Sequence, residues 1–331
     1  MTRKINNSYE LGQSNAPDTG GDMLKTRADG TLVWEGVADT TFVPYSFQGS
    51  NSGFIAGGDG VSNTINKYAF ASNVTADDHG DLLTARRNGA GSSSTTEGFT
   101  AGGHTGSASN LVDKFTFTSN VTASDHGDLS ASLYGKAGHS SSDSGFTSGG
   151  ADNSDVASSI VDKYSFSSNT TASSHGDLSV ARTYAAGISS VDSGFTASGF
   201  TTSNTTTIDY FTFASNTTAT DHGDSSVSKR GVAGCSSTDY GFSCGGTGGG
   251  NSDVIDRFAY SSNVTSTNWG SLTVARGDVT GTSSTTDGFV AGGTGSTDTI
   301  DKFSFSSSST VADHGNLNLG IVAAATTGSQ Y

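Results

Sequence analysis

Histidine beside aspartate is the most chemically suggestive pattern in this sequence. Five of the 7 histidines stand in one recurring phrase, Asp-His-Gly-Asp or a close variant of it. Imidazole and carboxylate groups bind transition metals and also carry out acid–base catalysis. Each copy of the phrase, however, offers one histidine and two carboxylates, too few and too poorly spaced for a dedicated metal site. The histidines are His79, His126, His175, His222 and His314, and Trp269 stands at the one remaining copy of the position.

Copies of a phrase on units related by rotation meet only if they lie closest to the rotation axis. This phrase leads into the segment expected to be outermost, so we interpret the histidines as part of a repeated turn or packing motif. The remaining copy, Asn268-Trp269-Gly270-Ser271, lacks both histidine and carboxylate although the phrases around it are intact. No unit combines a nucleophile with histidine and carboxylate. We therefore predict that the chain is not an enzyme and uses no metal or cofactor.

The basic residues point to a binding face. Of 16 lysines and arginines, seven lie between the last strand expected in one unit and the first strand of the next. Arg86, Arg182 and Arg276 share one repeat position, and we expect them to brace neighbouring units. Residues that depart from the repeat in the same region are better candidates for ligand contacts. The predicted ligand-binding face comprises Arg87, Tyr134, Lys136, Tyr184, Arg230 and His104.

Two further patterns have both a chemical and a structural interpretation. Cys235 and Cys244 are equidistant from the midpoint of an expected turn near residues 239–240, so we expect them to face each other across two strands. They could form a disulfide, but the sequence has no secretory signal and we favour free thiols. The Asn-x-Thr triplets match the acceptor pattern for N-glycosylation, and for the same reason we interpret them as turns. They begin at Asn73, Asn120, Asn169, Asn216 and Asn263.

Six copies of one unit make up most of the chain. A Gly-Phe pair recurs at Gly53, Gly98, Gly145, Gly194, Gly241 and Gly288, with 45 to 49 residues between successive copies. An apolar-Asp-Lys-aromatic-x-aromatic phrase follows, as in Val112-Asp-Lys-Phe-Thr-Phe117, and then Ser-Asn-Val-Thr and the histidine phrase. Turn residues between the apolar stretches predict four short strands per unit. In the second unit these are 90–95, 98–103, 112–119 and a short outer strand at Leu129.

A four-stranded sheet has two apolar faces that it cannot bury alone, and six such sheets around an axis bury them against one another. We therefore predict an all-β fold, a six-bladed β-propeller of four-stranded antiparallel blades over residues 49–331. The first unit lacks an inner strand, and residues 320–328 match the missing strand. The C-terminal segment should therefore pair with residues 53–58, which closes the ring and removes two free sheet edges.

Residues 1–48 do not repeat and form an N-terminal arm. A hairpin is expected around Asp29-Gly30, and Leu32, Val33 and Trp34 after it are the candidate docking residues. The arm is either a flexible leader or a segment that folds on a partner. The net charge of −15 argues against nucleic-acid binding. No apolar run is long enough to span a membrane and no secretory signal is present, so we expect synthesis in a cytoplasm.

The repeated phrases, among them Ile300-Asp-Lys-Phe-Ser-Phe305 and Gly-Asp-Leu-Ser-Val-Ala-Arg182, resemble kelch-like repeats in structural proteins of marine tailed phages, notably cyanophages. The resemblance covers about residues 50–331. The arm segment 21–34 is similar to the short leaders of phage fibre and appendage proteins. This resemblance implies a virion protein assembled in the host cytoplasm. Its arm would dock on other virion proteins, its propeller would face outward, and it would be a homo-oligomer in the particle.

Three functional hypotheses follow. The first is a fibre or appendage protein whose propeller engages the host surface, most plausibly a glycan. The second is a purely structural decoration protein of the head or tail. The third is a cellular kelch-like adaptor that binds a protein partner, which no accessory domain supports.

Overall fold

The computed structural model describes residues 50–318 apart from 59, 61, 296 and 309–310, together with the backbone of three strands outside that range. The chain divides into two units, Met1–Ser46 and Phe47–Tyr331. In the first unit, strand β1 (Asp22–Thr26) pairs antiparallel with β2 (Leu32–Gly36). The two strands confirm the predicted hairpin. The turn residues Asp29-Gly30 and the side chains of Leu32, Val33 and Trp34 lie outside the described structure, so the docking role of these three residues stays a prediction.

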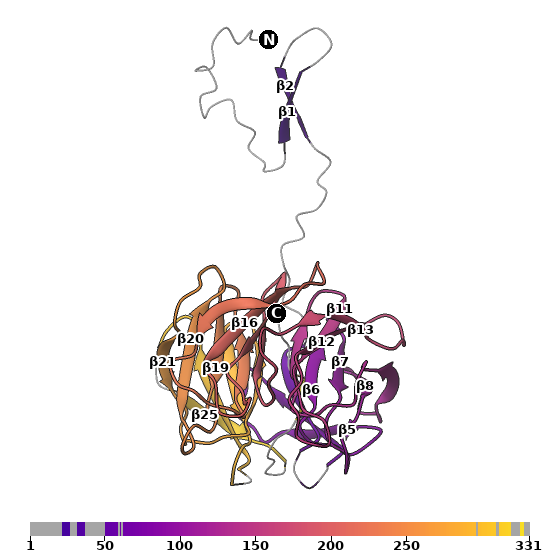
Figure 1. Cartoon of the computed structure of the whole chain (residues 1–331), viewed down its shortest axis with the longest axis vertical. Helices are drawn as coiled ribbons and strands as arrows, with labels where there is room; N and C mark the ends of the chain where they lie inside the picture. The colour runs from indigo at the N-terminus through magenta and orange to yellow at the C-terminus, as the bar shows by residue number, and fades with distance from the viewer. Residues whose placement is uncertain are drawn as a thin grey trace. The chain divides into compact units, whose positions relative to one another are not determined.

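The second unit is a six-bladed β-propeller, as predicted. Its described residues contain no helix, and its strands form six four-stranded antiparallel sheets in chain order (Figure 1). Among the described residues, no helix has the length and apolar character needed to cross a membrane.

From the innermost to the outermost strand, the first three blades are as follows. Blade 1 contains β26 (Ala325–Thr327), β3 (Ser52–Ala56), β4 (Thr64–Ala69) and β5 (Asp77–Asp81). Blade 2 contains β6 (Ala90–Ser93), β7 (Glu97–Ala101), β8 (Leu111–Thr116) and β9 (Ser124–Asp128). Blade 3 contains β10 (Ala137–Ser140), β11 (Ser144–Ser148), β12 (Ile160–Ser165) and β13 (Ser173–Asp177).

The other three blades repeat this order. Blade 4 contains β14 (Ala186–Ser189), β15 (Ser193–Ala197), β16 (Thr207–Thr212) and β17 (Thr220–Asp224). Blade 5 contains β18 (Ala233–Ser236), β19 (Tyr240–Cys244), β20 (Val254–Ala259) and β21 (Thr267–Ser271). Blade 6 contains β22 (Thr280–Ser283), β23 (Asp287–Ala291), β24 (Thr299–Ser304) and β25 (Ala312–Asn316).

The ring is closed by the C-terminal strand. Strand β26 pairs antiparallel with β3 and places Ala325 opposite Ala56 and Thr327 opposite Phe54. The innermost strands then contact one another in an unbroken cycle, from β26 to β6, β10, β14, β18, β22 and back to β26. The predicted pairing of the two ends of the propeller is confirmed.

The outer strand lies earlier in the sequence than predicted. In blade 2 it is Ser124–Asp128, which contains the histidine phrase itself, and Leu129 follows it as a buried residue outside the strand. The register against β8 shifts between Leu111 and Asp113, and Gly127 has a φ of 99°. A glycine at this bulge allows a backbone conformation that other residues adopt only with strain.

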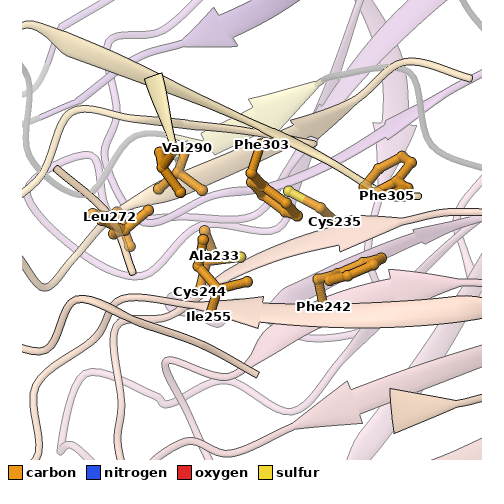
Figure 2. Packing of buried hydrophobic residues seen from close by; sticks show 11 residues of the cluster. Ala233, Cys235, Phe242, Cys244, Ile255, Leu272, Val290, Phe303 and Phe305 are labelled. Atoms are coloured by element: carbon orange, nitrogen blue, oxygen red, sulfur yellow. The ribbon is translucent and has the colours of Figure 1, made fainter. Parts of the chain in front are cut away.

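The Gly-Phe pair owes its two residue types to two different contacts. Gly98 lies opposite Phe115 on the next strand, and a Cβ at Gly98 would come within 2.4 Å of the Phe115 ring. Phe99 instead points to the next blade and stacks on Phe166, with 4.7 Å between ring centroids. Figure 2 shows the same arrangement between blades 5 and 6, where Phe242 stacks on Phe305 at 4.9 Å within a buried cluster. The remaining stacks are Phe54–Phe117, Phe146–Phe213, Phe195–Tyr260 and Phe289–Phe70.

The two cysteines lie in the cluster of Figure 2 and both are buried free thiols, as favoured. The prediction that they face each other directly is wrong. Cys235 lies opposite Phe242 and Cys244 opposite Ala233, so the cysteines are diagonal neighbours. The turn is centred one residue earlier than assumed, because Ser236 pairs with Gly241. Burial raises the pKa of Cys244 well above its ordinary value, and the neighbouring Cys235 thiol raises it further.

Candidate ligand-binding site

The recurring histidines join neighbouring blades. His79 on β5 places its Nε2 2.8 Å from the carbonyl oxygen of Thr116, on the third strand of the next blade. Since a carbonyl only accepts, the imidazole donates an N–H there. Trp269 makes the same bond through its indole Nε1, 2.9 Å from the oxygen of Ser304. These bonds confirm the packing interpretation. The other pairs are His126–Ser165, His175–Thr212, His222–Ala259 and His314–Ala69.

The asparagines of the Asn-x-Thr triplets join blades in the opposite direction. Asn120 lies in the turn before β9, and its side-chain amide donates to the carbonyl oxygen of Asp78 on the preceding blade, at 2.9 Å. This confirms the interpretation of the triplets as turns and gives the amide nitrogen a structural partner. The equivalent residues Asn73, Asn169, Asn216 and Asn263 also donate to backbone carbonyl oxygens of the preceding outer strand.

Buried ion pairs fix the connections that lead into the inner strands. Arg86 lies just before β6, and its guanidinium is 2.8 Å from the carboxylate of Asp113 on β8 of the same blade. It also donates to the backbone oxygens of Gly102 and Leu111. Burial lowers the pKa of Arg86 and raises that of Asp113, while the attraction between the two groups opposes both shifts. Arg182–Asp209 and Arg276–Asp301 repeat the pair at 2.9 and 3.0 Å within their own blades. The arginines are therefore structural, but the prediction that they brace neighbouring blades is wrong for their side chains, which join strands of one blade.

Lys136 belongs to this buried set and not to the ligand-binding face, which corrects the prediction. It is 5% exposed, its ammonium lies 3.7 Å from Asp162, and it donates to the oxygen of Gly149. In blade 3, Leu133 occupies the repeat position that Arg86 has in blade 2. The basic residue of blade 3, Lys136, stands three residues later. Burial lowers the pKa of Lys136 to about 8, and the nearby Asp162 carboxylate limits the fall.

Four of the other predicted residues line one cavity, which we call the axial cavity. It has a volume of about 690 Å³ and is lined by connections that lead into the inner strands of blades 2 to 6 and by loops beside them. Among the predicted residues, the axial cavity brings together Arg87, Tyr134, Tyr184 and Arg230. Asp155, Phe200 and Asp278 also line it. A ligand role for any of them stays a prediction.

One wall of the axial cavity is a chain of hydroxyl and carboxylate groups. The Tyr134 hydroxyl donates to the carboxylate of Asp155, and the rings of Tyr134 and Tyr184 lie 6.1 Å apart. Burial raises the pKa of both tyrosines, so both hydroxyls stay protonated at neutral pH. Asp152 holds the loop that carries Asp155, because its carboxylate accepts the N–H groups of Ser154 and Val156.

His104 stands behind this wall. It packs edge-to-face on Tyr134 with 5.6 Å between ring centroids, and its Nδ1 accepts the N–H of Gly106. It is not among the residues that line the axial cavity. The structure therefore places His104 as a support for Tyr134.

A stacked cation also lines the axial cavity. The guanidinium carbon of Arg230 lies 4.5 Å from the centre of the Phe200 ring, within the range of a cation–π interaction. The backbones of Arg230 and Thr247 exchange two hydrogen bonds, of 3.1 and 2.8 Å. The side chain is thus anchored at both ends.

A ring of left-handed backbone positions, one just before the inner strand of each of blades 2 to 6, includes three residues that line the cavity. Asn88, Tyr184 and Asp278 have φ values of 54°, 57° and 50°, and Gly135 and Gly231 occupy the same position in blades 3 and 5. Backbone hydrogen bonds link the ring from blade to blade: Gly135 to Asn88, Tyr184 to Gly135, and Gly231 to Tyr184, each at 2.8 Å. A tyrosine with positive φ is unusual, and residues held in such conformations cluster at functional sites.

Sequence reasoning missed Asp155, Phe200 and Asp278. Two of them had a visible signal. Asp155 lies in the one unit with a 49-residue interval, so its loop is longer than its counterparts, and Phe200 replaces a small or polar residue after the second strand. Asp278 had none, because its importance comes from a ring that only the structure reveals.

No protein-family model matches the chain, and a search of the curated proteins finds no match either.

Proposed function

We propose that this chain is a non-enzymatic virion protein of a tailed phage. The propeller binds a glycan of the host surface in the axial cavity, and residues 1–48 dock on other virion proteins. The virion setting rests on the resemblance of the repeats and of the arm described above. The binding role rests on the cavity.

One observation carries the binding role: the cavity lining breaks the repeat while the scaffold keeps it. The residue after the position of Arg86 is Arg87, Tyr134, Thr183, Arg230 or Gly277 in successive blades. A purely structural propeller has no need for four different residue types at one position. The variation fits a single asymmetric ligand that contacts each blade differently. Aromatic rings together with convergent hydroxyl, carboxylate and guanidinium groups match a sugar, which has apolar faces and polar edges.

Glycan binding by the full chain tests this proposal. Tyr184→Gly is the most informative variant, because glycine already occupies the same left-handed position in blades 3 and 5. We expect it to remove binding on a glycan array without loss of thermal stability. Val264→Ser changes a side chain that is 53% exposed on an Asn-x-Thr turn, and should bind like the unmodified chain. If no glycan binds and virions with Tyr184→Gly adsorb normally to cells, a decoration role replaces this proposal.

Deletion of residues 1–46 tests the arm separately. We expect the propeller to fold and to be lost from purified particles. If the shortened protein still co-purifies with virions, the arm is not the anchor.

A further inference from the structure

Arg230 is a half-buried cation, and within the described part of the chain no carboxylate serves as its counter-ion. Arg86, Arg182, Arg276, Lys136 and Lys229 all pair with an aspartate inside their blades. Arg230 directly follows Lys229 and lines the axial cavity. Among the described residues, no carboxylate lies within ion-pair distance of Arg230, and its guanidinium takes part in no hydrogen bond. Because removal from water is unfavourable for an unpaired charge, this site favours a ligand anion.

The guanidinium is also held in place. Stacking on Phe200 at 4.5 Å fixes the plane of the group, and the backbone pairing with Thr247 fixes the start of the side chain. A cation ordered in advance loses little side-chain entropy when it binds an anion.

The surroundings favour a singly charged, planar anion. A guanidinium presents parallel N–H groups that match the two oxygens of a carboxylate. Two carboxylates, Asp155 and Asp278, and one cation besides Arg230, Arg87, line the same cavity, and the chain carries a net charge of −15. The two carboxylates and the net charge oppose a doubly charged phosphate more strongly than a carboxylate. The tyrosine wall offers a ring face and the Asp155 carboxylate, which suit the C–H and O–H groups of a sugar ring.

We propose that the axial cavity selects a sugar residue that carries a carboxylate, of the uronic acid type, and that Arg230 binds this carboxylate. The inference rests on the proposed glycan-binding function and adds the class of sugar.

The test compares each acid with its own neutral form. The full chain is titrated with the methyl glycosides of glucuronic and galacturonic acid, and with the same glycosides as methyl esters. We expect the acids to bind about ten- to a hundredfold more tightly, the range for a charge-assisted hydrogen bond. Arg230→Gln should abolish the difference between acid and ester. Arg230→Lys should restore only part of it, because an ammonium has no planar fork.

Arg257→Gln is the matched control. Arg257 also stacks on aromatic rings, at 3.9 Å from Trp269 and 4.5 Å from Tyr240, and its loss changes the net charge by the same amount. It does not line the axial cavity, so the preference for the acid should survive. Equal loss in both variants would reduce the effect to general charge and overturn the assignment of Arg230.

The outcomes separate this inference from the proposed function. If acids and esters bind equally and Tyr184→Gly abolishes both, the cavity binds glycans and the inference is wrong. Tighter binding of sulfated or phosphorylated sugars than of uronates would also overturn it. If no glycan binds at all, the proposed function fails and the inference fails with it.

Discussion

Trp269 donates its indole N–H to the carbonyl oxygen of Ser304 at 2.9 Å, in the place where His222 donates to Ala259 in the preceding pair of blades, also at 2.9 Å. Both rings pack on the phenylalanine of their own Gly-Phe pair, Trp269 on Phe242 and His222 on Phe195. Two chemically different rings thus supply one N–H group at one place. The position requires a planar ring whose N–H group reaches a carbonyl oxygen of the next blade.

The first prediction follows from this equivalence. Trp269→His should change the free energy of unfolding by less than about 1 kcal/mol, because the donor is kept. His222→Ala should cost about 1–3 kcal/mol, because the partly buried carbonyl of Ala259 loses its partner. Urea unfolding measures both. A His222→Ala protein as stable as the original would contradict the packing role, as would a zinc-dependent rise in stability that His222→Ala removes.

The architecture could be predicted because each unit repeats contacts that need particular residue types. Glycine is required under the Phe115 ring and an aromatic residue is required to stack on the next blade, so the spacing of Gly98-Phe99 and its copies reports the blades directly. The outer strand was misplaced because aspartate and glycine are uncommon in strands. Asp125 and Gly127 form one here because blade packing outweighs their local preference.

The site was predictable only in part. Departure from the repeat pointed to Arg87, Tyr134, Tyr184 and Arg230, which the fold brings into one cavity. The same reasoning failed for Lys136, because its role depends on a leucine three residues earlier and on a carboxylate on another strand. Such compensation becomes visible only when the three positions are placed in space.

A second prediction concerns ring closure. A chain ending at residue 318 lacks β26, which leaves the edge of β3 unpaired and opens the contact of the inner strands between β22 and β6. We expect it to lose the cooperative thermal transition of the full chain. Thr326→Pro is a milder variant, because it removes one N–H within β26, opposite Ile55, and should lower the midpoint. A 1–318 protein that unfolds at the midpoint of the full chain would show that β26 does not close the ring.

A third prediction exploits the displaced cation of blade 3. Lys136→Met leaves the buried Asp162 carboxylate without a counter-ion and should cost about 3–5 kcal/mol of stability. Adding Leu133→Arg supplies a cation from the position that Arg86 uses in blade 2, and should recover much of the loss. Denaturant unfolding of the single and double variants gives the comparison, with Leu133→Met as the control. If the double variant is no more stable than Lys136→Met, the two positions are not interchangeable.

The fourth prediction concerns His139, which is fully buried on β10. Its Nδ1–H donates to the oxygen of Ile188 at 3.0 Å and its Nε2 accepts the Ser148 hydroxyl at 2.9 Å, an arrangement that suits the neutral ring. Burial lowers the pKa of His139 from 6.5 to about 4. Because the pKa is lower in the folded state, the unfolded chain binds more protons between these values. The contribution of His139 to the free energy of unfolding is therefore fully present above pH 6.5 and is lost as the pH drops toward 4.

The loss due to His139 should total about 3 kcal/mol, at 1.36 kcal/mol for each unit of pKa difference. His139→Gln keeps a donor and an acceptor but does not titrate. Carboxylates affect both proteins alike, so the difference in unfolding free energy between the original chain and the variant isolates the histidine. As the pH falls from 6.5 to 4, we expect the unfolding free energy of His139→Gln to rise by this amount relative to that of the original chain. Urea unfolding of both proteins at each pH measures the difference. Parallel stability curves for the two proteins would mean that His139 titrates normally and is not held neutral by the blade.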